Sequence, residues 1–206
     1  SGSVQWAKAV GGTNSDCGCS VIQTSDSGFV VAGHTRSYGA GSDDLFLVKF
    51  NSSGSVQWAK AVGGTSFDEG YSVIQTSDGG YAVAGFTLNF GAGDYDLFLM
   101  KFNSSGTIQW AKAVGGTRID EGHSVIQTFD SGLVVAGYTF SFGAGGYDLF
   151  LVKFNSSGSV QWAKAVGGTN TDYGYSVIQT SDSGFVVAGH TRSYGAGVYD
   201  LFIVKF

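Results

Sequence analysis

A unit of 52 residues repeats four times along this 206-residue chain, and this repetition constrains the fold more than any other feature of the sequence. The copies span residues 1–50, 53–102, 105–154 and 157–206, and an Asn-Ser pair joins each copy to the next. In the alignment, 32 of the 50 columns are identical in all four copies. Repeat lengths of about 20–50 residues are typical of solenoids, propellers and arrays. The chain is therefore predicted to form a single domain, residues 1–206, built from one structural unit used four times.

Each copy is predicted to contain four short β-strands, which in the second copy cover residues 72–76, 81–87, 96–102 and 107–114. These runs are rich in β-branched and aromatic residues, and turn sequences such as Ser-Asp-Gly-Gly and Asn-Ser-Ser-Gly separate them. The chain has 34 glycines and no proline, and its runs of helix formers are too short for a helix. The sequence predicts an all-β protein made of antiparallel meanders.

The third strand of each copy is apolar on both faces, as Leu97, Phe98, Leu99 and Met100 show in the second copy. Strands without a polar face belong in a sheet that is covered on both sides. A four-stranded meander that repeats and is buried on both faces is a propeller blade. We therefore predict a β-propeller of four 52-residue, four-stranded antiparallel blades.

The first strand-like run of the chain, residues 4–10, corresponds to the fourth strand of a blade, whereas the last copy supplies only three strands. We expect residues 4–10 to pair with residues 201–206 and so to close the ring. Two alternatives stay open. Two chains pair into an eight-bladed ring by self-association through exchanged blades, or the chain is a segment of a longer array.

Four phrases recur in the copies: Q-W-A-K-A-V-G-G, S-D-G-G-Y, A-G-x-T and Y-D-L-F-L-x-K-F. Together they resemble the secreted β-propeller repeats of bacterial and archaeal surface proteins, over the whole chain. The phrase N-S-S-G-S-V-Q-W also resembles the tryptophan-docking repeat of quinoprotein propellers, but no quinone or calcium constellation accompanies it. The first resemblance implies an extracellular or cell-surface protein that acts as a structural or adhesive scaffold or a protein-binding module. It brings no catalytic residues, so a non-catalytic function is expected.

Charge and hydropathy exclude two classes of partner. The formal net charge is −5, and phosphate binding needs clustered Lys and Arg, so nucleic-acid binding is not expected. No apolar run approaches the roughly 18 residues of a membrane span, so membrane insertion is not expected. No cofactor motif is recognised, and no cofactor is predicted.

The copies differ mainly in two sets of loops: those between the second and third strands, and those between blades. In a propeller both sets lie on one face, which we call the long-loop face. Binding residues concentrate on variable loops that a rigid scaffold holds. We therefore expect a protein or a glycan to bind the long-loop face, although loops also drift when nothing constrains them.

His34 with Arg36 and His190 with Arg192 are the most distinctive residues of the long-loop face, because only the first and last copies carry them. A closed ring would make these copies neighbours, and the four side chains are then predicted to meet an anion or a sugar. The first alternative function is a lectin-like module with carbohydrate pockets between blades. Its pockets would use the aromatic residues Tyr38, Phe90, Phe142 and Tyr194.

The second alternative is a hydrolase or lyase that uses loop carboxylates. Its candidates are one aspartate per inter-blade loop: Asp16, Asp68, Asp120 and Asp172. Such residues more often cap loop N–H groups, so no catalytic residue is assigned. Cys17 and Cys19 share a strand face, and His34 or His123 would be their candidate co-ligands. One Cys-x-Cys pair falls short of the usual four-ligand zinc pattern, so no metal site is predicted.

Three asparagines begin Asn-Ser-Ser triplets in the predicted turns, and these triplets are acceptors for N-glycosylation in a secreted protein. The residues are Asn51, Asn103 and Asn155. The same sequence is also favourable turn chemistry, so both interpretations are kept.

Overall fold

The computed structural model describes residues 2–206, which contain fifteen β-strands in four antiparallel sheets. Ser1, the first residue of the first predicted repeat, lies outside the described residues. Blade 1 consists of β1 (Asp16–Gln23), β2 (Phe29–Thr35), β3 (Asp44–Phe50) and β4 (Val56–Val62). Blade 2 consists of β5 (Asp68–Gln75), β6 (Tyr81–Thr87), β7 (Asp96–Phe102) and β8 (Ile108–Val114). Blade 3 consists of β9 (Asp120–Gln127), β10 (Leu133–Thr139), β11 (Asp148–Phe154) and β12 (Val160–Val166). Blade 4 consists of β13 (Asp172–Gln179), β14 (Phe185–Thr191) and β15 (Asp200–Lys205).

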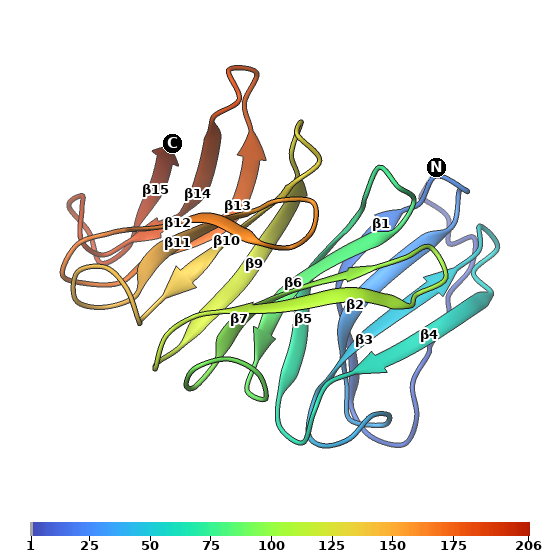
Figure 1. The fold of residues 1–206 in the computed structure, drawn as a ribbon. Helices are drawn as coiled ribbons and strands as arrows, with labels where there is room; N and C mark the ends of the chain where they lie inside the picture. The colour runs from blue at the N-terminus through green and yellow to red at the C-terminus, as the bar shows by residue number, and fades with distance from the viewer. Residues whose placement is uncertain (1) are drawn as a thin grey trace.

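The predicted all-β class and the antiparallel meander are confirmed, since strands in each sheet pair in chain order. The blades follow one another as a fan, with blade 1 and blade 4 at its two ends (Figure 1). The first strands of successive blades contact one another: β1 with β5, β5 with β9, and β9 with β13. We call β1, β5, β9 and β13 the inner strands. The fold is therefore propeller-like.

Apolar side chains from facing blades form the core between them. Between blades 1 and 2, Leu45 and Leu47 pack with Val83, Phe98 and Met100, and all five are buried. Equivalent clusters lie between blades 2 and 3 and between blades 3 and 4. Burial on both faces explains why β3, β7 and β11 have no polar face. The core is thus a set of three equivalent inter-blade layers.

The hairpin turns between the first two strands of each blade require one residue with positive φ. Gly79 supplies it in blade 2 with a φ of 78°, as the glycine-rich turn predicts. Ser27, Ser131 and Ser183 take the same conformation in the other blades. A buried lysine supports the turn: the Nζ atom of Lys101 donates to Asp78 at 2.8 Å and to the Phe102 carbonyl oxygen at 3.1 Å. An invariant Lys and an invariant Asp thereby fix each hairpin.

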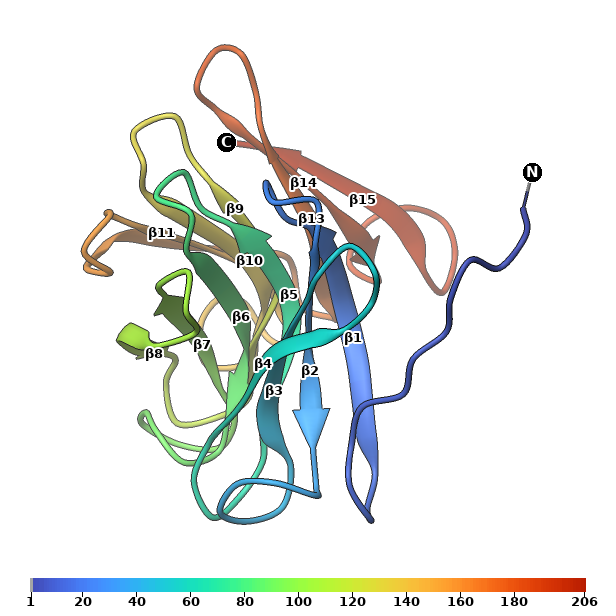
Figure 2. The same ribbon diagram turned by 90° about the vertical axis from the view of Figure 1, so that its right-hand side faces the viewer.

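The predicted closure of the ring is not present in the structure. Residues 2–15 form no strand, and β15 pairs with β14 alone. Figure 2 shows the N-terminal segment running as a separate trace away from β15. As a consequence, blade 4 has three strands, and the Leu201 side chain is 80% exposed although Leu45, Leu97 and Leu149 in the same column are fully buried. Among residues 2–206, no helix is long and apolar enough to cross a membrane.

Candidate functional site

The inner strands begin four residues earlier than predicted, and this moves several variable residues from loops into strands. β5 begins at Asp68 rather than at Ser72. A β-bulge between Gly70 and Ser72 interrupts the pairing with β6, and blades 1 and 4 have the same irregularity. The variable residues on either side of the bulge glycine therefore belong to the inner strands and not to the inter-blade loops.

These residues gather with variable residues of the second strands and of the loops that precede the third strands. We call the set the inner-strand cluster: His34, Glu69, Tyr71, Glu121, His123, Tyr138, Tyr147, Tyr173, Tyr175 and His190.

Aromatic rings connect the inner-strand cluster across the blades. The His123 ring stacks on Tyr71 with centroids 4.9 Å apart and on Tyr138 at 5.1 Å. Tyr173 meets Tyr138 edge-on at 4.3 Å and His190 at 4.8 Å. Burial raises the pKa of Tyr71 and Tyr138, and it raises the pKa of Tyr173 to about 12, so these phenols stay neutral. Burial also lowers the pKa of His190. The cluster is a continuous aromatic surface across three blades.

Two carboxylates lie within this surface at equivalent positions of neighbouring blades. The side chains of Glu69 and Glu121 are only 18% and 10% exposed. Each faces a histidine: Nδ1 of His34 lies 3.3 Å from Glu69, and Nε2 of His123 lies 3.2 Å from Glu121. Burial raises the pKa of Glu69, and the negative charges of Asp43 and Glu121 add to the rise, while His34 opposes it. A largely buried acid with a raised pKa, on the inner strand next to one that carries a second carboxylate, is a candidate for an acid–base pair.

The histidines and arginines of the long-loop prediction do not form one site. His34 lies against Glu69 of blade 2, whereas His190 lies among Tyr173, Tyr175 and Tyr199 of its own blade. Arg36 forms a two-point ion pair with Asp43 at 2.7 and 2.9 Å. The Arg192 guanidinium lies 5.2 Å from the centroid of the Tyr199 ring. The prediction that the two His/Arg pairs meet is wrong, because blades 1 and 4 lie at opposite ends of the fan.

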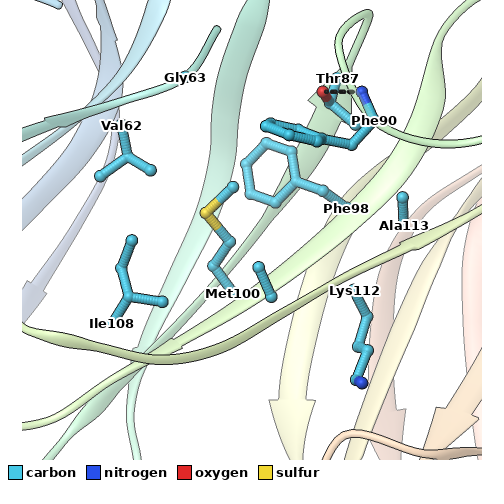
Figure 3. Close-up of a pocket in the computed structure, with 10 residues that line it drawn as sticks. Val62, Gly63, Thr87, Phe90, Phe98, Met100, Ile108, Lys112 and Ala113 are labelled. Carbon is cyan, nitrogen blue, oxygen red and sulfur yellow. Dashed lines mark hydrogen bonds between the residues drawn. The ribbon is translucent and has the colours of Figure 1, made fainter.

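The four loop aromatics of the lectin-like alternative lie apart from the inner-strand cluster, on the side of each blade away from the inner strands. Phe142 stacks on Phe150 with centroids 5.7 Å apart, and Tyr38 and Tyr194 pack in the same way on the phenylalanine of their own third strand. A pocket of about 250 Å³ opens beside Phe90, lined by Phe98, Met100 and residues of β4 and β8 (Figure 3). Equivalent pockets adjoin Tyr38 and Phe142.

The pockets stand where the lectin-like alternative expects them, but their lining is almost entirely apolar. In Figure 3 the hydrogen bond that is drawn joins the Phe90 amide, as donor, to Thr87 Oγ1 at 3.3 Å, and it stays within the protein. Sugar hydroxyls need polar partners, and a pocket of Val62, Phe98, Met100 and similar side chains provides few. The inner-strand cluster has the more suitable chemistry for a polar ligand.

Three metal-ligating side chains come together in blade 1. Cys17 pairs directly with His34 across β1 and β2, and the thiols of Cys17 and Cys19 and one ring nitrogen of His34 lie within 4.8 Å of one another. Burial and the neighbouring Cys17 raise the pKa of Cys19 to about 11. These are the residues that could hold a metal ion, with two soft sulfur donors and one nitrogen, one donor fewer than a structural zinc site.

The inter-blade aspartates have structural partners, as the capping interpretation predicts. The Asp120 carboxylate accepts hydrogen bonds from the Gly116 amide at 2.8 Å and from Ser141 Oγ at 2.7 Å, and Thr139 donates a third. Asp68 makes equivalent contacts. Loop donors thus hold one or both oxygens of these carboxylates, which fits a structural capping role.

The three candidate glycosylation asparagines lie in the turns between third and fourth strands. Oδ1 of Asn103 accepts hydrogen bonds from the amide and hydroxyl of Ser105 and from the Thr107 amide, at 2.8–3.0 Å. Asn51 and Asn155 repeat the pattern. The geometry therefore accounts for these residues as turn formers, and glycosylation stays a prediction.

Comparison with known proteins supports a β-propeller repeat family. A family model described as "Domain of unknown function (DUF5122) beta-propeller" matches residues 29–56 and 130–160. The Regulatory protein FlaEY of Caulobacter vibrioides is 27% identical over 166 residues, which cover 69% of this chain and 17% of that protein. The chain thus spans about a sixth of the length of this curated relative.

Among solved structures, the endo-1,5-α-L-arabinanase from Thermotoga petrophila is similar in trace, with a TM-score of 0.47 and 14% sequence identity over 90% of this chain and 55% of the arabinanase chain. This comparison does not support the predicted non-catalytic scaffold or the expectation that the chain is not an enzyme. We withdraw both predictions. At this level of similarity, the comparison gives the chain neither a reaction nor a substrate.

Proposed function

We propose that the chain is a hydrolase that cleaves glycosidic bonds at the inner-strand cluster. The observation that carries the proposal is the pair Glu69 and Glu121, two largely buried carboxylates on neighbouring inner strands within an aromatic surface. Glycoside hydrolysis commonly uses two carboxyl groups, one as general acid and one as general base or nucleophile. We assign that pair to the two glutamates rather than to the aspartates of the inter-blade loops, which accept hydrogen bonds from loop donors.

The tyrosines give a reason for a carbohydrate substrate. The apolar face of a sugar ring packs on an aromatic ring, and the phenol hydroxyls donate hydrogen bonds to sugar hydroxyls. Tyr173 and Tyr175 stack with centroids 5.8 Å apart, and Tyr175 is exposed. A sugar that rests on these rings lies next to the carboxylates, because Tyr175 contacts the His123 ring and His123 contacts Glu121.

The raised pKa of Glu69 assigns the roles. A protonated Glu69 donates its proton to the glycosidic oxygen as the bond to the anomeric carbon breaks. Glu121 takes a proton from the attacking water, whose hydroxyl joins the anomeric carbon, or it attacks that carbon itself and is released by water in a second step. The hydrogen bond between His123 Nε2 and Glu121 orients that carboxylate, and the His34 ring lies beside Glu69.

A panel of oligosaccharides and polysaccharides, assayed for newly formed reducing ends, tests the proposal. We expect activity on at least one substrate, and a fall of about 100-fold or more in kcat for Glu69→Gln and for Glu121→Gln. Asp94→Asn is the matched control, because Asp94 is an exposed carboxylate on the loop between β6 and β7 and is not a member of the inner-strand cluster. The control is expected to keep full activity.

Three results would contradict the proposal. They are cleavage that survives both glutamate substitutions, unsaturated products that indicate a lyase, and no cleavage of any substrate by folded wild-type protein. Sugar binding without cleavage belongs to the third result and would return the chain to the class of binding modules.

A further inference from the structure

The two ends of the fan expose blade faces that are buried everywhere else in the molecule. On blade 4, the side chains of Leu201 and Ile203 are 80% and 64% exposed, and Ile178 is exposed beside them. On blade 1, Val21 is 65% exposed, whereas Val73, Val125 and Val177 in the same column are buried. We call these surfaces the blade-4 face and the blade-1 face. Both are apolar surfaces without a partner among residues 2–206.

Each face carries the same residue columns as one of the two blades that form an inter-blade layer. In the observed layers, the leucines of one blade pack against the valine and phenylalanine columns of the next. Leu201 and Ile203 occupy the leucine columns. Val21, Val31, Phe46 and Val48 occupy the columns that receive them. Because the repeats are nearly identical, the blade-4 face is complementary to the blade-1 face.

The bulge glycine of each inner strand also reflects how a leucine of one blade packs against the next blade. A Cβ atom at Gly70 would collide with Leu45, one at Gly122 would lie 3.1 Å from Leu97 and one at Gly174 would lie 3.0 Å from Leu149. The glycine therefore makes room for a leucine of the preceding blade. At Gly18, by contrast, only Val31 of the same blade comes within 4 Å. The hollow there, about 200 Å³ and lined in part by Val31, Phe46 and Val48, fits a leucine from outside.

Hydrogen bonds between blades repeat in the same way. The Val73 amide donates to Ser20 Oγ at 3.2 Å, and the Asp68 amide donates to the Asp43 carbonyl oxygen at 2.7 Å. Both bonds recur between blades 2 and 3 and between blades 3 and 4. The next acceptor in the first series is Ser176 Oγ, and the next in the second series is the Tyr199 carbonyl oxygen. Neither accepts such a hydrogen bond within residues 2–206.

The N-terminal segment lies beside blade 1 in the position that the fourth strand of a preceding blade occupies elsewhere in the molecule. The Trp6 ring packs on Phe29 with centroids 5.8 Å apart, as Trp58 packs on Tyr81 and Trp162 on Phe185 at the same distance. The latter two tryptophans belong to the fourth strand of the preceding blade. Residues 4–10 thus adjoin blade 1 in the position of the fourth strand of a preceding blade, and residues 2–206 place no other strand of such a blade there.

We propose that the blade-4 face of one chain binds the blade-1 face of a second copy of the same chain, and that two such contacts close an eight-bladed ring. In each contact, residues 4–10 of one copy pair with the free edge of β15 of the other. Ser176 Oγ of one copy accepts from the Val21 amide of the second. Two copies give eight blades, the upper end of the usual range of four to eight, whereas three copies would give twelve.

Light scattering coupled to size-exclusion chromatography tests the proposal, and the wild-type chain is expected to have twice the mass of one chain. Leu201→Asp on the blade-4 face and Val21→Asp on the blade-1 face are each expected to give folded monomers, because both side chains are exposed in the single chain. Phe129→Asp is the matched control: Phe129 is equally exposed but lies at a hairpin tip. It is expected to leave the dimer intact.

Mixing the two interface variants gives a second, independent readout. A Val21→Asp chain keeps a normal blade-4 face, and a Leu201→Asp chain keeps a normal blade-1 face. One contact of the ring is therefore restored in the mixture, and an affinity-tagged Val21→Asp chain should retain untagged Leu201→Asp chains. A monomeric wild-type chain overturns the proposal, as does a dimer that survives both aspartate substitutions or a mixture without retention.

Discussion

Truncation of one leucine column gives a direct measure of how much each inter-blade layer stabilises the fold. Leu97 is fully buried between blades 2 and 3, where it packs with Val135 and Phe150. Leu→Ala substitutions at such sites cost about 2–5 kcal/mol through lost burial and the cavity that remains. For a chain of this size, a loss of about 3 kcal/mol lowers Tm by about 6–12 °C. Leu97→Ala is therefore expected to be strongly destabilising.

The same substitution at Leu201 is the internal control, because the repeat column is the same and only burial differs. On the Val21→Asp background, where self-association is blocked, Leu201→Ala is expected to change the free energy of unfolding by less than about 0.5 kcal/mol. Urea unfolding followed by tryptophan fluorescence measures both changes. Equal losses at Leu97 and Leu201 on that background would refute the reasoning, since they would mean that the blade-4 face is covered within one chain.

Three further predictions follow from individual contacts. Hydrogen bonds from Thr128 and Lys153 lower the pKa of Asp130 to about 2 from an ordinary 3.8. The contribution of this carboxylate to stability is therefore complete above about pH 4 and is lost as the pH falls toward 2. Over this interval, the acid unfolding of Asp130→Asn should be less steep than that of the wild type. Burial lowers the pKa of His190 below 6.5, so the folded state favours the neutral ring and stability falls as the pH drops below 6.5; an NMR titration that shows an unshifted His190 would contradict this. Asn103→Ala removes three hydrogen bonds from one turn and should cost about 1 kcal/mol in thermal or urea unfolding, whereas Ser104→Ala, which changes an exposed neighbour, should cost little.

The repeat allowed the fold to be predicted to the level of the blade. The invariant strands, both hairpin turns and the burial of Leu97, Phe98 and Leu99 on both faces followed from composition and periodicity. Closure of the ring did not follow, because it depends on how far each blade rotates relative to the last. That rotation is set by the packing of whole inter-blade layers, and one repeat does not encode it in a recognisable pattern.

The sequence indicated the histidines of the candidate site but not its glutamates. Variation among the copies pointed to His34 and His190, but Glu69 and Glu121 precede the first predicted strand of their repeats, in segments that were expected to be loops between blades. The cause is the β-bulge, which breaks the alternation of a strand and leaves a sequence such as Asp-Glu-Gly-Tyr without a period of two. A usable signal was present in the sequence, since positions 17, 19 and 34 of the repeat vary between acidic, aromatic, thiol and imidazole side chains while their neighbours are constant.

A crystal structure of the Glu121→Gln variant with an oligosaccharide that the wild type cleaves would test the central claim most directly. We expect the sugar to rest on Tyr173 and Tyr175, with its glycosidic oxygen within hydrogen-bonding distance of Glu69. A sugar bound instead in the apolar pockets beside Phe90 and its equivalents, away from both glutamates, would contradict the assignment of the inner-strand cluster as a hydrolytic site.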